Sequence, residues 1–298
     1  MPPGTSMAHN LPISPGTIHR RRPVLRRVVT RFAAGLLLAP VIGCLSPGAA
    51  PSCGSGGAQV RTPAGALWPN EPAGLPLLSD EPFNTLTENG WRTVQRQRTN
   101  GSGVVVARDS TAPVSPPGVL QFAYAVGFPG GYSPAAVFYD PATATRDTYF
   151  AFWWKPSAPW QDNSPSNVNK IAFLLTASGP TIYIMMFGDN GAYTVQVEPE
   201  FPDDVRRLAP NAAATPVVLG AWHRIEWHVR YNTMPSLRNG LTEWWLDGVL
   251  QGRYTDLQMP GDAGFREYQL APTWGGMGGT KAEPDCFWYD HARLGGAP

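Results

Sequence analysis

The sequence is poor in lysine and has no clustered metal ligands. Only three of its 298 residues are Lys, although Lys and Arg together number 23. A nucleic-acid-binding surface needs a concentrated basic patch, so we expect no nucleic-acid partner. No Cys or His cluster has the spacing of a zinc site, and His223 and His228 stand five apart on a predicted strand, pointing to opposite faces. We therefore expect no transition metal and no cofactor.

The sequence also lacks helical periodicity and the common signature of a serine nucleophile. No stretch repeats apolar residues at helical spacing over more than two turns, and the chain contains 32 Pro. No G-x-S-x-G motif is present. These absences exclude a helical fold and give no support to nucleophilic catalysis.

The first 43 residues resemble an export signal. They contain six Arg and no acidic residue, and they include the apolar run 32–42, which is too short to span a bilayer. The run ends in V-I-G-C, which resembles a lipobox, so we expect Cys44 to be acylated and to anchor the protein in the bacterial cell envelope. Ordinary secretion without a lipid is the alternative. The remaining chain has 17 basic and 22 acidic residues, a net charge of about −5.

Residues 44–78 are rich in Gly, Pro, Ala and Ser, which is typical of a flexible tether. With Cys44 acylated, Cys53 and Cys286 are the remaining cysteines, and an export compartment would permit them to pair. A disulfide would fix a segment whose composition favours freedom, so we favour unpaired cysteines while leaving the pairing open. Residues 79–298 are predicted to form one domain.

The sequence of the domain predicts an all-β fold. Residues 222–231 alternate between a mostly apolar face and a charged face, and the Asp-Gly pair at 247–248 predicts a hairpin. The mostly apolar face carries His223, Ile225, Trp227, Val229 and Tyr231. Short alternating or apolar runs separated by turn residues predict eleven strands. These strands are 104–107, 119–125, 135–139, 148–155, 169–175, 182–187, 192–198, 222–231, 241–246, 249–254 and 286–294. Two antiparallel sheets are expected to bury their facing sides, with the 11 Trp supplying much of the core.

Four segments carry a resemblance to a known superfamily. They are W-H-R-I-E-W-H-V-R-Y-N-T followed by W-W-L-D-G, Y-F-A-F-W-W-K-P at 149–156, N-K-I-A-F-L at 169–174, and D-C-F-W-Y-D-H-A-R-L at 285–294. Over about residues 80–296 the chain resembles concanavalin A-like jelly rolls, in particular bacterial secreted polysaccharide lyase-like and laminin-G-like domains. The resemblance implies a β-sandwich that binds glycans across one sheet, and a structural calcium is possible in such folds.

Candidate binding residues follow from strand parity. Arg224, Glu226 and His228 share the polar face of one predicted strand, and unpaired charges are costly to bury, so we expect them to face solvent. They then either line the concave groove or form a solvated convex face with cross-strand ion pairs. Aromatic platforms beside polar groups suit sugars. The predicted sugar-contacting surface therefore combines those three residues with Trp244 or Trp245, Gln196, and Lys170 at the rim. The expected partner is a polysaccharide, the expected membrane contact is through the lipid alone, and the expected state is a monomer.

Three alternatives to simple binding remain open. A lyase acting by β-elimination would use His228, Arg224 and Lys170 as its catalytic groups. A hydrolase needs paired carboxylates, and the nearest pair here is Glu243 with Asp247. A structural domain with no sugar ligand is the third alternative.

Overall fold

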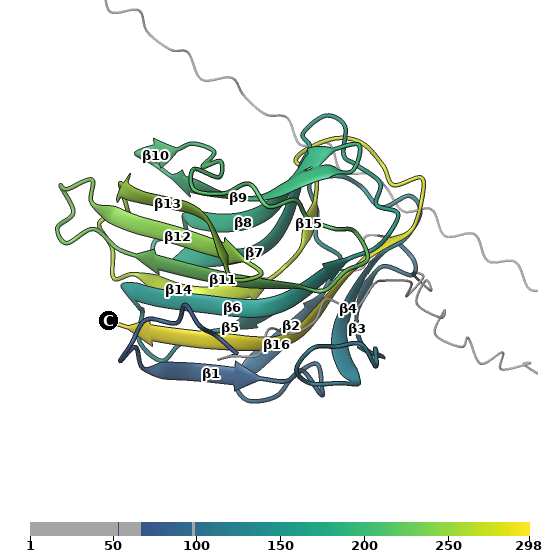
Figure 1. The fold of residues 1–298 in the computed structure, drawn as a ribbon, viewed down its shortest axis with the longest axis horizontal. Helices are drawn as coiled ribbons and strands as arrows, with labels where there is room; N and C mark the ends of the chain where they lie inside the picture. The colour runs from purple at the N-terminus through teal and green to yellow at the C-terminus, as the bar shows by residue number, and fades with distance from the viewer. Residues whose placement is uncertain (1–52, 54–66, 97–98) are drawn as a thin grey trace, which may run out of the picture. The chain divides into compact units, whose positions relative to one another are not determined.

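The computed structural model describes residues 53, 67–96 and 99–298, which form two antiparallel sheets packed face to face (Figure 1). Within these residues every regular element is a β-strand, and no helix has the length and apolarity needed to cross a membrane. The predicted export signal, residues 1–43, and Cys44 lie outside the described residues. The fold is therefore all-β, as the alternating pattern predicted.

The first sheet, which we call sheet A, has eight strands. Its order is β13-β12-β11-β6-β16-β4-β3, and β1 pairs with β16. The strands of sheet A are β1 (Leu77–Glu81), β3 (Gly103–Arg108), β4 (Gly118–Tyr124), β6 (Asp147–Pro156), β11 (His223–Arg230), β12 (Gly240–Leu246), β13 (Val249–Leu257) and β16 (Asp285–Ala297).

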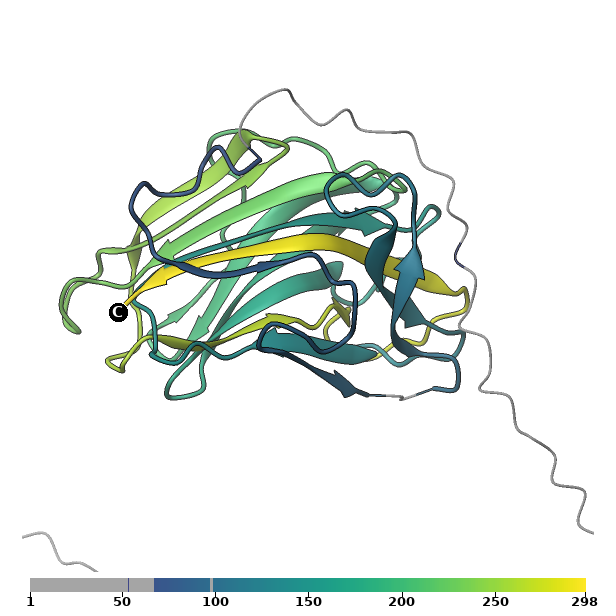
Figure 2. The ribbon, with the colours of Figure 1, turned by 90° about the horizontal axis from the view of Figure 1, so that it is seen from below.

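The second sheet, sheet B, also has eight strands. Its order is β10-β9-β8-β7-β14-β5-β2, and β15 pairs with β7. The strands of sheet B are β2 (Trp91–Gln95), β5 (Ala135–Tyr139), β7 (Val168–Thr176), β8 (Thr181–Asp189), β9 (Ala192–Phe201), β10 (Asp204–Val205), β14 (Phe265–Leu270) and β15 (Thr273–Trp274). Figure 2 shows the two sheets as two layers, with the dark-blue segment of residues 67–81 running beside the yellow strand β16.

The core lies between the inner faces of the two sheets. On β11, Ile225, Trp227 and Val229 are 0% exposed and pack in this core, as the alternation predicted. On β6, Trp154 faces the same core, whereas its neighbour Trp153 belongs to a separate buried cluster on the outer side of sheet A. Adjacent side chains on a strand point to opposite faces, so the Trp pair is divided between two layers.

A tight turn joins β12 to β13. Asp247 has φ 54° and Gly248 has φ 84°, the left-handed conformations that a two-residue type I′ hairpin requires at both positions. Asp and Gly tolerate this conformation better than other residues, because Gly lacks a Cβ and Asp can bond to nearby backbone groups. The hairpin predicted from this dipeptide is confirmed.

The eleven predicted strands each overlap an observed strand, and five strands were missed. The missed strands are β1, β2, β10, β14 and β15. The two shortest contain only two residues each, too few for any alternation to be visible. β1 begins within the predicted tether and β2 lies inside the predicted domain; both are paired with other strands, β16 and β5.

The N-terminal part of the described chain is attached to the sandwich. A disulfide joins Cys53 to Cys286 on β16, with the two Cα atoms 6.0 Å apart. Our preference for unpaired cysteines is therefore wrong, because local composition carries no information about the distant contact between Cys53 and Cys286. Residues 67–78, which the same composition assigned to the tether, pack on sheet A through Trp68 and continue into β1.

Candidate functional site

The outer face of sheet A, where the sequence placed most sugar-contacting side chains, is covered by the segment that begins at residue 67. The backbone N–H and side-chain amide of Asn70 donate to the two carboxylate oxygens of Glu226, at 2.9 and 3.0 Å. The Tyr149 hydroxyl donates to the same carboxylate at 2.7 Å, and the Arg224 guanidinium donates to the Leu67 carbonyl at 3.2 Å. Arg224 is 4% exposed and Glu226 0%. The expectation that they face solvent is wrong, because this segment both buries them and supplies their partners.

A second segment, residues 109–117, extends this cover. The Asp290 carboxylate on β16 accepts hydrogen bonds from the backbone N–H groups of Val114 at 2.7 Å and Ser115 at 3.1 Å. Asp290 is fully buried, and this burial raises the pKa of its carboxyl. Lys155 on β6 forms an ion pair with Asp109. The polar groups on this side of sheet A therefore bind other parts of the same chain.

His228 lies between two carboxylates on the same side of sheet A. Its Nε2 is 2.6 Å from Asp147 and its Nδ1 is 3.0 Å from Glu243, and the residue is 7% exposed. Burial lowers the pKa of His228, but the hydrogen bonds and charges of the two carboxylates outweigh burial and raise it above its ordinary value. The hydrogen bond from His228 correspondingly lowers the pKa values of Asp147 and Glu243. Asp147, His228 and Glu243 thus form an ion-paired triad in which both imidazole nitrogens of His228 contact a carboxylate.

The two carboxylates considered for hydrolysis have separate structural partners. Glu243 contacts His228 and lies 3.3 Å from the Arg253 guanidinium. Asp247 pairs with the His223 ring at 2.8 Å and accepts the backbone N–H of Arg224 at 2.8 Å. Each carboxylate thus stabilises the β11–β12–β13 region, and the pair gives no two-carboxylate catalytic arrangement.

The two tryptophans proposed as a sugar platform lie on opposite sides of sheet A. Trp244 is 0% exposed in the core, where its indole N–H donates to the Val195 carbonyl at 3.0 Å. Gly252 on β13 makes room for this ring, since a Cβ there would lie 2.2 Å from the indole. Trp245 faces outward and is half-buried. Trp244 is therefore a core residue and not a platform.

Lys170 and Gln196 lie on the outer face of sheet B, on the opposite side of the sandwich from Arg224, Glu226 and His228. Register places Lys170 on β7, Met185 on β8 and Gln196 on β9 side by side, in one row across three strands. The next row holds Phe173, Tyr183 and Glu198, and the row after it Leu175, Thr181 and Glu200. We call this set, together with Phe187 and Thr194 at its other end, the sheet B face.

Two cations lie across aromatic rings on the sheet B face. The Lys170 ammonium is 3.9 Å from the centre of the Tyr183 ring and 3.4 Å from the Glu200 carboxylate. Arg207, in the loop after β10, lies 4.1 Å from the centre of the Phe187 ring and 3.1 Å from Glu198. Both cations are thus neutralised by carboxylates of β9.

Gln196 presents a buried acceptor without a donor. Its side-chain N–H donates to the Thr194 hydroxyl at 3.1 Å, but its carbonyl oxygen has no hydrogen-bond partner, and the residue is only 7% exposed. An unpaired buried acceptor costs about 1–3 kcal/mol.

Tyr183 acts as a donor on this face. Burial raises the pKa of its hydroxyl, and the hydrogen bond to Glu198 together with the charge of that carboxylate raises it further. The phenol therefore stays protonated over the physiological range. Tyr183 is therefore a hydrogen-bond donor in the arrangement observed.

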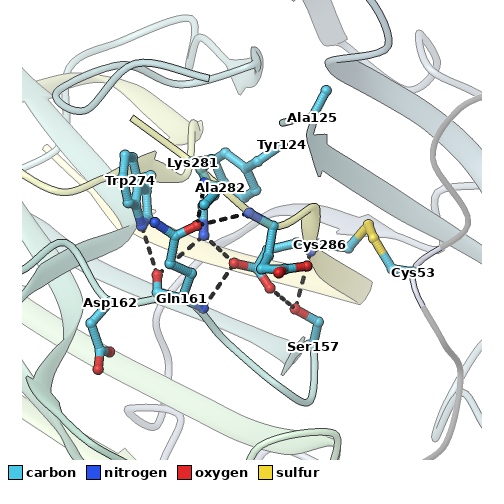
Figure 3. Close-up of polar contacts among 12 residues, drawn as sticks. Cys53, Tyr124, Ala125, Ser157, Gln161, Asp162, Trp274, Lys281, Ala282 and Cys286 are labelled. Carbon is cyan, nitrogen blue, oxygen red and sulfur yellow. Dashed lines mark hydrogen bonds and ion pairs between the residues drawn. A yellow bond between two sulfur atoms is a disulfide. The ribbon is translucent and has the colours of Figure 1, made fainter. Parts of the chain in front are cut away.

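A second polar cluster, beside the disulfide, is closed to ligands (Figure 3). Lys281 forms an ion pair with Asp285 and donates to the Gln161 carbonyl at 3.2 Å, and its ammonium is 4.1 Å from the centre of the Trp160 ring. Burial lowers the pKa of Lys281 to about 8. Ser157 donates to the other carboxylate oxygen of Asp285 at 3.0 Å. Because Lys281 and Asp285 are 1% exposed, the cluster anchors the glycine-rich loop that precedes Lys281.

In the part of the chain that the structure describes, no group of three or more His, Cys, Asp or Glu residues is placed to hold a metal ion. Within those residues we therefore find no candidate set of ligands for a structural calcium.

The structure divides the predicted site between two faces and reveals further members of one of them. Gln196 and Lys170 share the sheet B face with Tyr183, Glu198 and Glu200, and the last three were absent from the predicted set. The shared parity of Gln196, Glu198 and Glu200 on β9 was visible in the sequence. The position of Lys170 on β7 and Tyr183 on β8 beside them was not, because register between strands is set by the fold.

Solved structures of known proteins share this fold. An endo-β-1,4-glucuronan lyase from the fungus Trichoderma reesei is 18% identical, with a TM-score of 0.50 over 70% of this chain and 92% of that one. The cellulose-induced protein Cip1 is 16% identical, with a TM-score of 0.51 over 74% and 97% of the two chains. A variant of the alginate lyase Aly36B, solved with an alginate trisaccharide, is 11% identical, with a TM-score of 0.51 over 70% and 88%.

No family model matches the chain, and no curated protein matches it in sequence. The structural likeness is therefore one of fold. The chain adopts the concanavalin A-like jelly roll that the four sequence segments predicted.

Proposed function

We propose that this protein binds an extracellular polysaccharide on the sheet B face. The observation that carries the proposal is the contrast between the two outer faces. Residues 67–76 and 109–117 cover the side of sheet A that bears Arg224 and Glu226. Among the described residues, the hydrogen bonds and ion pairs of five outward side chains of sheet B join them to one another, to Thr194 or to Arg207; the five are Lys170, Thr181, Gln196, Glu198 and Glu200.

The chemistry of the sheet B face suits a sugar chain. The carboxylates of Glu198 and Glu200 are partly exposed and can accept hydrogen bonds from hydroxyl groups. Half-buried Phe173 and Phe187 add apolar surface beside them, which suits the C–H faces of pyranose rings. Glycan ligands need this combination of directional acceptors and flat apolar patches.

Export is part of the proposal. The disulfide between Cys53 and Cys286 supports an oxidising compartment, since cytosolic thiols are kept reduced. The Arg-rich start and the apolar run before Cys44 support an export signal, and acylation of Cys44 would place the domain at the cell envelope.

The test is affinity electrophoresis through gels that contain soluble polysaccharides. The double variant Glu198→Ala/Glu200→Ala should lose retardation, while its melting temperature changes little because both carboxylates are partly exposed. Asp256→Ala is the matched control, since it removes an exposed carboxylate paired with Arg206. The proposal fails if no polysaccharide retards the parent protein, or if the two variants behave alike.

A second candidate function is a lyase that cleaves a uronate-containing glycan by β-elimination. The observation that favours it is the partly exposed ammonium of Lys170, which lies over the protonated phenol of Tyr183 on the same face. After losing its proton, the Lys170 amine would take the proton alpha to the uronate carboxylate, and Tyr183 would protonate the leaving oxygen.

Ultraviolet absorbance of the unsaturated product tests the lyase directly. The parent protein should generate this signal on a uronate polymer, and Lys170→Ala should abolish it while leaving binding measurable. If incubation with alginate, polygalacturonate and glucuronan produces no unsaturated ends, this candidate is excluded.

A further inference from the structure

The register of sheet B places outward side chains of six strands in one continuous row. Each strand contributes one residue, which is paired in register with the next across β2, β5, β14, β7, β8 and β9. We call this set the six-strand row, and its members in that order are Arg92, Phe138, Gln269, Phe173, Tyr183 and Glu198. Directly paired residues point to the same side of a sheet, so all six lie on the outer side of sheet B.

Apolar side chains form a floor along this row. Phe138 belongs to one buried cluster on the outer side of sheet B, and Tyr183 belongs to another. Phe173 is half-buried and packs against both clusters, so the apolar contacts extend from β5 to β8. The C–H faces of several sugar rings in succession can pack on a floor of this kind.

Polar groups that solvent can reach stand along the same floor. The Arg92 side chain is 56% exposed, and its guanidinium lies 4.3 Å from the centre of the Phe138 ring beneath it. Gln269 is half-buried, and the Glu198 side chain is 17% exposed. The members of the row that a ligand can reach are therefore Arg92, Gln269, Phe173 and Glu198.

The six-strand row is longer than a single sugar. Neighbouring strands lie about 4.8 Å apart, so the row spans about 24 Å from Arg92 on β2 to Glu198 on β9. An extended chain of pyranose rings advances by a similar distance at each ring, so about five rings would cover the row. A chain that coils would leave the floor after a few rings.

We infer that the sheet B face takes an extended, linear polysaccharide, which lies along the six-strand row and contacts it over about five sugar rings. This inference rests on the proposed function and names the form of its ligand. It adds β14, β5 and β2 to the binding face, with Gln269 and Arg92 as further contact residues.

Affinity electrophoresis of the intact protein separates extended chains from coiled ones. Hydroxyethylcellulose, glucomannan and alginate have extended backbones, whereas dextran and soluble starch coil or branch. At least one of the extended polymers should retard the protein. Dextran and starch should not retard it, because they cannot follow the row from β2 to β9.

A series of oligosaccharides measures the length of the site. Calorimetry with oligomers of about two to eight rings, prepared from the polymer that retards the protein, should show affinity that rises up to about five rings and then levels off. A plateau at about two or three rings would overturn the inference, because most of the row would then be unused.

The variant Arg92→Ala tests the far end of the row. It removes an exposed side chain whose ion pair with Asp140 contributes little to stability, so the variant should fold as the parent does. Its affinity for a hexasaccharide should fall about threefold to tenfold. Its affinity for a trisaccharide, which fits at the Glu198 end and is measured by competition, should stay unchanged. Arg108→Ala is the matched control, since Arg108 is an exposed Arg at the end of β3 in sheet A, and this variant should bind both oligosaccharides as the parent does.

The outcomes separate the inference from the function beneath it. Equal retention on dextran and on the extended polymers, or unchanged hexasaccharide binding by Arg92→Ala, would overturn the inference and leave polysaccharide binding intact. Retention on no polysaccharide would remove the proposed function and the inference together.

Discussion

Removing the disulfide should cost a substantial part of the stability of the domain. The bond joins residues 233 positions apart, and it therefore restricts the unfolded chain over most of its length. The loop-entropy relation gives about 5 kcal/mol at 25 °C for a loop of this size, and residual structure in the unfolded chain reduces such values, so we expect about 3–5 kcal/mol. The substitution Cys53→Ala is the appropriate change, because Cys286 is 0% exposed and its replacement would also open a cavity.

Urea unfolding followed by tryptophan fluorescence measures this loss. The free energy of unfolding of Cys53→Ala should fall below that of the oxidised parent by the stated amount, and reduction should bring the parent down to the level of the variant. Dithiothreitol should leave Cys53→Ala itself unchanged. A loss under about 1 kcal/mol, or equal sensitivity of parent and variant to reductant, would refute the entropic reasoning.

Three further predictions follow from the fold, the triad and the sequence. Ile225→Ala should cost about 2–4 kcal/mol in urea unfolding, because the side chain is 0% exposed in the core and its removal leaves a cavity; a loss under about 1 kcal/mol would contradict that placement. His228 has a raised pKa in the folded state, so its stabilisation is full below about pH 6 and is lost as pH rises through the folded value. The stability gap between the parent and His228→Gln should therefore narrow as pH rises from the ordinary His pKa, about 6.5, through the raised folded value. A constant gap would argue against the Asp147–His228–Glu243 triad. Cys44→Ala should move the protein from the membrane fraction to the soluble fraction, whereas unchanged partitioning would show that no lipid is attached there.

Strand content and side-chain parity were accessible from the sequence, because both depend on local geometry. Side chains on a strand alternate with a period of two, so Ile225 and Trp227 had to share a face and Arg224 and Glu226 the other. The dipeptide at 247–248 likewise specified its own turn, since few residues accept left-handed backbone. The fold class followed from these local features.

The identity of the covered outer face, from which the proposed binding face follows, could not be obtained in the same way. Parity placed Arg224 and Glu226 together but carried no information about which segment lies over them. Asn70, which binds Glu226, is 156 residues away in sequence, in a stretch whose composition predicted a tether. A charged face buried under such a segment and a charged face in solvent have the same alternating pattern.

The sequence alone determined an all-β chain, its strand parity and the turn between β12 and β13, because these are set by neighbouring residues. The tertiary structure alone decided which outer face is covered, that Cys53 meets Cys286, and that Lys170, Met185 and Gln196 form one row. These features depend on the register between strands and on contacts between distant segments. Register and contacts are fixed when the whole core is buried, and no short stretch of residues specifies them.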